Sequence, residues 1–150
     1  MSNPDRASTK DVPLKGFTPH GSMELQVSGQ LNVIEARGPF NIELVRAGDL
    51  AQEQVDAQLQ AKGRWATMLV FRDNAMASFE VLAEVEAIVK RRVAKGLCPA
   101  GVALVLGPEV EGAALMGPYY RKAYTNAGIL TQLFATPEAG QAWLHGLLQT

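Results

Sequence analysis

WATMLVF, at residues 65–71, is a continuous apolar run. A second run of this kind, GVALVL, occupies residues 101–106. Short unbroken apolar runs are typical of strands buried on both faces, as in a parallel sheet that helices cover. We therefore predict that the two runs are neighbouring parallel strands at the centre of the fold.

The segment between the two runs, residues 78–95, is predicted to be a helix. Acidic residues come early in it and basic residues late, which complements the helix dipole, and Gly96 follows as a stop. The basic run 90–92 is interpreted as a solvated helix end. The apolar residues at helical spacing, which we expect to face inward, are Phe79, Leu82, Val89 and Val93.

Toward the N-terminus, the pattern predicts a hairpin and a helix. Residues 23–27 alternate apolar and polar, residues 32–36 form a second strand, and Gly29 lies in the turn between them. Asn41 is a plausible N-cap for a helix over residues 42–62. Within that helix, Gly48 and Asp49 are expected to make a break, with Asp49 starting a second piece.

Toward the C-terminus, we predict a helix, a strand and a last helix. Residues 112–126 are expected to be helical but interrupted at Gly117 and Pro118. A strand is predicted over 129–134, and Thr136 followed by Pro137 begins the final helix. The expected inner stripe of that helix is Ala139, Ala142, Trp143 and Leu147.

The predicted order is therefore ββαβαβαβα. It defines an α/β fold: a mostly parallel five-stranded sheet with an N-terminal antiparallel hairpin and helices on both faces. We expect a flexible arm over residues 1–22, which are poor in apolar side chains, and one domain over 23–150.

Composition narrows the functional classes. The 150 residues carry a formal net charge of −1, with 47% hydrophobic and 19% charged residues. Near-neutral charge argues against nucleic-acid binding, and no apolar run is long enough to span a bilayer. The N-terminus has no apolar region typical of a secretory signal, and Cys98 is the single cysteine. We expect a cytoplasmic protein.

Two sequence motifs, together with the element order, carry a family resemblance. They are ARGPFN at residues 36–41 and LFATPEAGQAWL at residues 133–144. With this order, the chain from residue 23 onward resembles the SpoIIAA-like, or STAS-like, family, and within it a branch of small bacterial proteins related in fold to CRAL-TRIO lipid carriers. The resemblance implies a non-enzymatic regulatory or protein-interaction module. Its alternative implication is a module that binds an apolar small molecule or lipid.

The family's phosphorylation switch has no matching acceptor in this chain. In the family's anti-sigma-factor antagonists, a phosphorylated Ser or Thr follows an Asp after the central strand. Asp73 matches that Asp, but Asn74 stands at the acceptor position and an amide is not a substrate for a serine kinase. The resemblance therefore implies a module without the phospho-serine switch.

Ligands of parallel sheets bind beyond the carboxyl ends of the strands. Polar and apolar side chains suited to a partner surface follow three of the predicted strands. An alternative interpretation is that Asp73 and Asn74 only cap the next helix. The candidate binding residues at this edge are Phe40, Asn41, Arg72, Asp73, Asn74, Met76 and Glu109.

All three tyrosines of the chain fall in one cluster beside a basic residue. Tyrosine and arginine are enriched at binding hot spots. Alternatively, Tyr120 and Tyr124, which share a helical face, are half-buried structural residues with wet hydroxyls. The candidate binding residues of the cluster are Tyr119, Tyr120, Arg121 and Tyr124.

Catalysis finds little support in the sequence. His20 and His145 lie in no triad or metal-ligand spacing, Cys98 precedes a proline beside an apolar strand, and no glycine-rich phosphate loop is present. We predict no enzymatic activity, no catalytic residues, no metal and no cofactor. The expected partners are an unidentified protein, an apolar ligand in a cavity of roughly 300 Å³ or more between helices 78–95 and 112–126, or a second copy paired through the hairpin edge.

Overall fold

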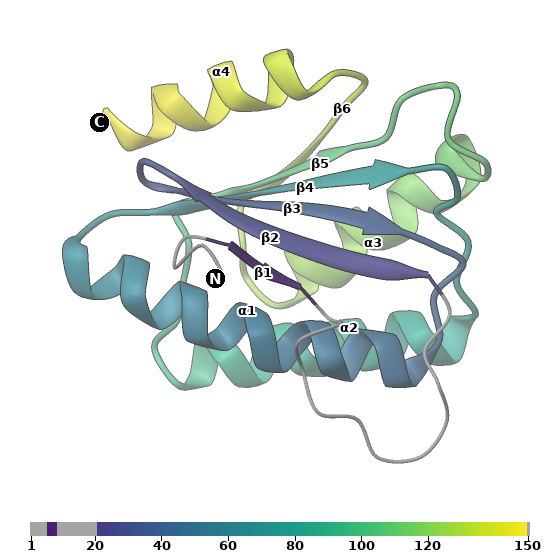
Figure 1. Ribbon diagram of the computed structural model, residues 1–150, viewed down its shortest axis with the longest axis horizontal. Coiled ribbons are helices and arrows are strands. Elements are labelled where there is room, and N and C mark those ends of the chain that lie inside the picture. Colours follow the sequence, from purple (N-terminus) through teal and green to yellow (C-terminus); the bar gives the residue numbers. More distant parts are fainter. Residues whose placement is uncertain (1–5, 9–20, 150) are drawn as a thin grey trace.

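The computed structural model describes residues 6–8 and 21–149. Their strands form one sheet of six strands in the order β1-β2-β3-β4-β5-β6 (Figure 1). The strands are β1 (Arg6–Ser8), β2 (Ser22–Ser28), β3 (Leu31–Arg37), β4 (Ala66–Arg72), β5 (Val102–Val105) and β6 (Thr131–Phe134). The helices are α1 (Ile42–Lys62), α2 (Phe79–Ala94), α3 (Ala113–Asn126) and α4 (Pro137–Leu148).

The predicted α/β fold is confirmed. β2 and β3 form the antiparallel hairpin, and Gly29 in their turn has a φ of 60°, a conformation that glycine adopts without strain. From β3 to β6 all neighbours are parallel. The five predicted strands are present, and the runs 65–71 and 101–106 supply β4 and β5 side by side.

The sheet has a sixth strand that the pattern did not indicate. β1 pairs antiparallel with the outer side of β2, with Arg6 opposite Gln26 and Ser8 opposite Glu24. Its three residues are too few to show a period. The rest of the predicted arm, apart from residues 21 and 22, lies outside the described residues, so the arm's flexibility stays a prediction.

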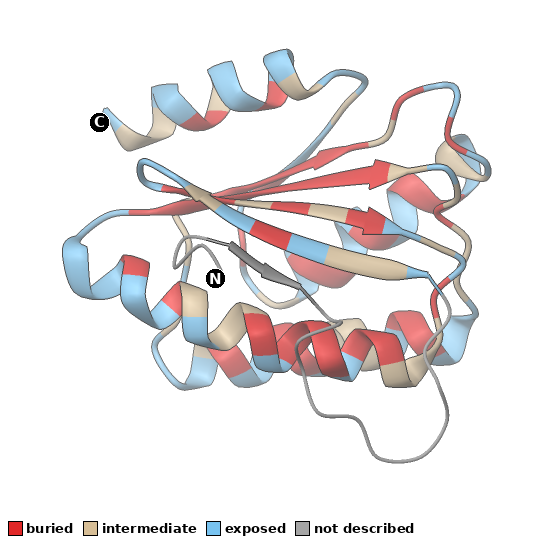
Figure 2. Cartoon of the chain, in the orientation of Figure 1, coloured by how far each residue is buried: buried red, intermediate tan, exposed pale blue. Residues whose placement is uncertain are grey.

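Helices cover both faces of the sheet unequally. Each crossover from β3 to β6 steps in the same direction, and since such crossovers are right-handed, α1, α2 and α3 come to lie on one face. α4 alone lies on the other face, against β4, β5 and β6 (Figure 1). The residues of β4 and β5 between the two helical layers are buried almost throughout (Figure 2).

Two hydrophobic cores result. The larger one lies between the sheet and α1–α3 and includes Leu44, Phe71 and Leu104. The smaller one lies under α4 and includes Met68, Val105 and the fully buried Leu144. Burial of side chains of this size contributes about 1.5–3 kcal/mol each to the stability of the fold.

Three local predictions about helices were wrong. α1 is continuous through Gly48, where the close approach of the Met23 sulfur leaves no room for a Cβ and so accounts for the glycine. α3 is likewise continuous through Pro118. In α4 the inward stripe is shifted by one residue: Ala139 and Ala142 are exposed, whereas Gly140 and Leu144 are buried beside the half-buried Trp143 and Leu147.

The searched helices include none of sufficient length and apolar character to cross a membrane, a finding that covers residues 6–8 and 21–149.

Candidate functional site

The loops that follow β3, β4 and β5 are joined to one another by backbone hydrogen bonds. Gly38 N donates to Asn74 O at 2.8 Å, and Phe40 N donates to Met76 O at 3.0 Å. On the other side, Ala75 N donates to the carbonyl of Glu111 at 2.9 Å. These three segments, 38–41, 73–78 and 106–112, which we call the edge loops, therefore extend the sheet as a fixed platform at its carboxyl edge.

Asp73 is an exposed polar residue of this platform, with 71% of its side chain exposed. Its φ of 64° is a left-handed conformation that aspartate tolerates better than most residues. Its carboxylate accepts a hydrogen bond from Arg37 Nη1 at 2.6 Å, and this pair raises the pKa of the Arg37 guanidinium. Arg72 pairs instead with Glu35 at 3.2 Å.

The other edge-loop candidates differ in exposure. Phe40 is buried, with its ring edge-on to Phe71 at 5.9 Å between centroids. Asn41 caps α1 by accepting from Leu44 N at 2.9 Å, as predicted. Glu109 is exposed, and its carboxylate lies against Gly107.

Met76 and Asn74 connect the edge loops to α3. The half-buried Met76 packs its sulfur against Gly112, just before α3. Asn74 uses both ends of its amide: Oδ1 accepts from Met76 N at 2.7 Å, and Nδ2 donates to Glu111 Oε2 at 3.2 Å. Asn74 is therefore a bracing residue of the loops and does not cap α2, a role that belongs to Ser78.

The tyrosine cluster is divided between the core and the surface. Tyr120 is buried with its ring 4.7 Å from that of Phe71, and its hydroxyl donates to Ala75 O at 2.8 Å, so that hydroxyl is not wet. Burial raises the pKa of Tyr120 and of Tyr124. Tyr119 and Arg121 are exposed, and Arg121 Nε donates to the Thr131 carbonyl on β6 at 3.1 Å.

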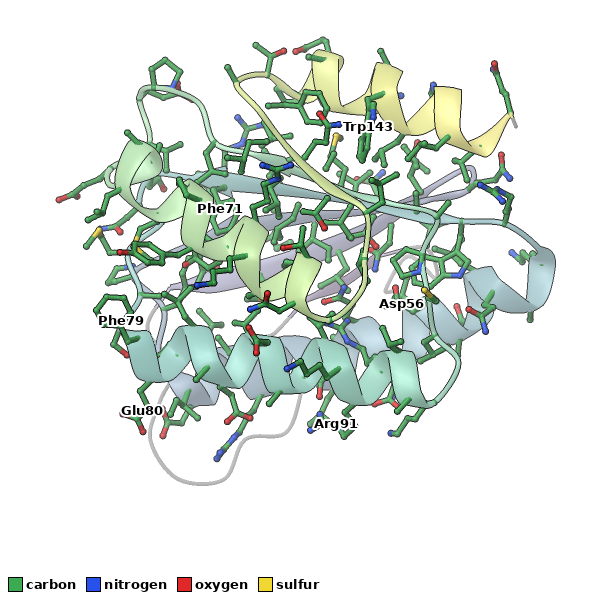
Figure 3. The ribbon with its side chains drawn as sticks, turned by 180° about the vertical axis from the view of Figure 1, so that it is seen from behind. Asp56, Phe71, Phe79, Glu80, Arg91 and Trp143 are labelled. Atoms are coloured by element: carbon green, nitrogen blue, oxygen red, sulfur yellow. The ribbon has the colours of Figure 1, made fainter. Side chains whose placement is uncertain are left out.

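Beside the edge loops lies an exposed apolar surface, which we call the aromatic patch: Phe79, Leu115 and Tyr119. Their exposed fractions are 73%, 58% and 41%. The rings of Phe79 and Tyr119 meet edge-to-face with centroids 5.5 Å apart. Figure 3 shows Phe79 and Glu80 at the N-terminal end of α2. The prediction that Phe79 faces inward was wrong, because the buried stripe of α2 runs through Val81, Ile88 and Arg92, and Phe79 lies outside it.

A buried ion cluster lies at the other end of α2. Arg92 is 6% exposed and lies 3.6 Å from Asp49 Oδ1 and 3.4 Å from Asp56 Oδ2, both on α1. Asn32 Nδ2 on β3 donates to Asp56 at 3.0 Å. Arg91 adds a further ion pair with Asp49. The interpretation of residues 90–92 as a purely solvated helix end was therefore wrong for Arg92, and Asp49 starts no helix.

Burial dominates the electrostatics of this cluster. Desolvation raises the pKa of Asp56 to about 6, although the charge of Arg92 and the hydrogen bond from Asn32 both act to lower it. Asp49 Oδ1 accepts no hydrogen bond within the part of the chain that the structure describes. Its contact with Arg92 Nε, at 3.6 Å, is longer than a hydrogen bond.

Between the sheet and the helices α1, α2 and α3 is a small apolar cavity of about 50 Å³. The predicted place was between α2 and α3, whereas the cavity is also lined by α1 and the sheet, and its lining includes the polar side chains of Asp49, Gln52 and Arg92. The cavity holds a few water molecules at most, since one water needs about 10–15 Å³ of such space. Three of the predicted binding residues line it: Phe40, Tyr120 and Tyr124.

Over the ranges 6–8 and 21–149, no three His, Cys, Asp or Glu side chains form a group able to hold a metal ion. Cys98 is exposed and unpaired with any other cysteine.

Comparisons with protein-family models, curated proteins and solved structures gave no match. The resemblance to SpoIIAA-like proteins therefore stays a prediction.

The structure thus brings most of the predicted candidates to one end of the sheet but separates them by exposure. Sequence reasoning missed Phe79 and Leu115 as surface residues and missed the buried cluster. A signal for the cluster was present: Arg92 follows Ile88 and Val89 by four and three residues, so it lies on their buried stripe.

Proposed function

We propose that this chain is a cytoplasmic, non-enzymatic interaction module of the SpoIIAA/STAS-like type that binds a partner protein through the aromatic patch and the edge loops. The observation that carries the proposal is the exposure of Phe79. A phenylalanine ring left 73% exposed and stacked edge-on against another exposed ring is a costly arrangement in water unless a partner covers it.

The surroundings of the patch support a protein partner. The edge loops are held by backbone hydrogen bonds, so little conformational entropy is lost when a partner docks. Exposed carboxylates of Asp73, Glu80 and Glu111 lie on the same end of the fold and provide a polar rim. Aromatic anchors inside a polar rim are the usual anatomy of a binding hot spot.

The proposal includes the absence of a phospho-serine switch. Both ends of the Asn74 amide are engaged within the loops. The nearby Ser78 hydroxyl accepts from Val81 N at 3.2 Å and so serves as the N-cap of α2. Asn74 has no hydroxyl to phosphorylate, and phosphorylation of Ser78 would modify the group that makes this capping contact.

A photo-crosslinking residue in place of Phe79 tests the proposal in a lysate of the source cells. The matched control carries the same residue in place of Leu50, which is 55% exposed on α1 and remote from the patch. We expect a discrete protein adduct at position 79 and none at position 50. The captured protein is then purified and titrated against the unlabelled chain, and Phe79→Ser should weaken its binding at least tenfold.

Equal adducts at positions 79 and 50, or a captured protein whose affinity ignores Phe79→Ser, would refute a docking role for the patch. Turnover of esters or phosphates that disappears with Asp73→Ala would refute the non-enzymatic assignment.

A second candidate function is binding of an apolar small molecule in the cavity under α2. Its apolar lining favours this candidate, but its volume of about 50 Å³ is well below the roughly 300 Å³ of common ligand pockets. Native mass spectrometry of the purified chain tests it: a retained apolar molecule that is lost on Ala36→Phe, a change that fills the cavity, would support this candidate. A bare chain would exclude a resident ligand.

A further inference from the structure

β6 is the last strand of the sheet, so within the described chain no strand lies on its outer side (Figure 1). The carbonyls of Leu130 and Phe134 accept hydrogen bonds from β5, at 2.9 Å each, and therefore face inward. Because the backbone groups of successive residues point to alternate sides of a strand, those of Thr131 and Leu133 face outward. The outer edge of β6 thus presents backbone groups that a further strand could pair with.

These outward groups are only partly occupied. Arg121 Nε on α3 donates to the Thr131 carbonyl at 3.1 Å. The N–H and C=O of Leu133 have no hydrogen-bond partner in the ranges 6–8 and 21–149. The leucines of this strand and just before it are also exposed, Leu133 by 39% and Leu130 by 52%. An open strand edge with exposed apolar side chains is a template for pairing with another chain.

A surface groove of about 420 Å³ lies along this edge, between β6 and α3. Its lining residues are Pro118, Arg121, Lys122, Thr125 and Leu133. Two of them are basic and none is acidic. Neither Arg121 nor Lys122 forms an ion pair with another residue of the chain that the structure describes. The groove therefore places two uncompensated cations beside the open backbone groups of Leu133.

The charge of the groove decides which strand fits the edge. A second copy paired through its own β6 would bring Arg121 and Lys122 of both copies to one joined edge, and like charges destabilise such pairing. In an acidic strand, carboxylates at every second position lie on one face and can meet both cations. Arg121 is held by its bond to Thr131, so its guanidinium loses little freedom when its other nitrogens bind a carboxylate.

We propose that the outer edge of β6 binds an extended acidic segment of a partner protein, which adds to the sheet as a further strand. Main-chain hydrogen bonds to Leu133 hold the segment, and Arg121 and Lys122 bind its carboxylates. The site is separate from the aromatic patch. The inference therefore goes beyond the proposed function, and its failure leaves the docking role of the patch untouched.

Calorimetric titration of the full chain with a capped peptide of alternating glutamate and valine, about six residues long, tests the proposal. Saturable binding is expected, and Lys122→Glu should weaken it by about tenfold or more, because attraction becomes repulsion. Lys62→Glu is the matched control: it makes the same charge change at an exposed lysine of α1 and should leave the affinity within about threefold. A peptide with lysine in place of glutamate should not bind.

N-methylation of the peptide separates strand addition from charge attraction alone. Methyl groups on the valine nitrogens block one edge of the added strand, and methyl groups on the glutamate nitrogens block the other. One methylated peptide should lose about tenfold or more in affinity, and the other should stay within about threefold. Circular dichroism establishes that each protein variant is folded.

Equal affinities of the two methylated peptides would overturn the proposal, and so would the absence of saturable binding below about 1 mM. Equal effects of Lys122→Glu and Lys62→Glu would overturn it as well, since the charge of the groove would then have no special role. Analytical ultracentrifugation tests the other occupant: a dimer of the chain that the peptide dissociates would assign this edge to a second copy and contradict the proposal.

Discussion

The two sides of α2 differ in the kind of side chain that is buried or exposed. Toward α1, charged side chains are taken into the interior, where Arg92 meets Asp49 and Asp56. Toward the outer end of α3, apolar side chains are left in water, where Phe79 meets Tyr119. One helix therefore buries one of its basic side chains, Arg92, and exposes its one aromatic ring, that of Phe79.

This contrast separates structural from functional residues. A buried charge with partners is costly to disturb and has no access to a ligand outside, so the ion cluster holds α1 and α2 together. An exposed aromatic ring contributes little to folding and remains available for a partner. Charged residues are thus the structural ones here, and apolar residues are the candidates for binding.

The largest expected effect on stability concerns the buried ion cluster around Arg92. Arg92→Met leaves Asp49 and Asp56 without their shared cation, and we expect it to lower the free energy of unfolding by about 3–5 kcal/mol. Urea denaturation measures the loss. Arg91→Met removes a half-exposed partner of Asp49 and should cost less than about 1 kcal/mol. Similar losses in the two variants would contradict the distinction between buried and surface charge.

The pH dependence of stability provides a second test of the buried ion cluster, through the titration of Asp56. The pKa of Asp56 is raised to about 6 from 3.8, so the folded state holds this proton more tightly than the unfolded state. Its contribution to stability is therefore full below about pH 4 and is lost as the pH rises through 6. The difference in unfolding free energy between wild type and Asp56→Asn should shift against wild type by about 2–3 kcal/mol from pH 4 to pH 7.

Denaturation curves of both proteins at several pH values measure that shift. A difference that is independent of pH would mean that Asp56 titrates in the folded protein as it does in the unfolded chain.

The strands were predictable because burial on both faces leaves a direct mark on the sequence. Residues 65–71 and 101–106 are apolar runs without alternating polar residues. The hairpin is recognised by apolar and polar residues that alternate on either side of Gly29. Helix starts at Asn41, Ser78 and Thr136 were also predictable, since a capping side chain acts on backbone groups within three residues.

The exposure of single helical residues was not predictable from apolar spacing alone. Phe79 has the same spacing relation to Leu82 as a core residue would, but the buried stripe of α2 runs through Val81, Ile88 and Arg92 and leaves Phe79 outside it. Arg92 lies on the apolar stripe of α2, but its counter-charges are about forty positions away on α1. Pairings of that range depend on the tertiary fold.

A smaller effect is expected at the solvent edge of the ion-paired flank. Lys95 Nζ lies 2.6 Å from Glu53 Oε1, and this pair lowers the pKa of the Glu53 carboxyl. Since Lys95 is half exposed, Lys95→Ala should change the unfolding free energy by about 0.2–1 kcal/mol, and the change should vanish in 1 M salt. Urea denaturation at low and high salt tests this. A change that persists in 1 M salt would mean that this ion pair is shielded from solvent, as the pairs of the buried cluster are.

The smallest expected effect on folding accompanies the largest expected effect on binding, and both concern Phe79. Phe79→Ser should shift the free energy of unfolding by no more than about 0.5 kcal/mol, because the ring is mostly exposed. The most direct measurement is the dissociation constant of Phe79→Ser for the partner captured at that position. The variant must have the same unfolding midpoint as wild type. An increase of at least tenfold is predicted, and an unchanged dissociation constant would contradict the assignment of the aromatic patch as the docking surface.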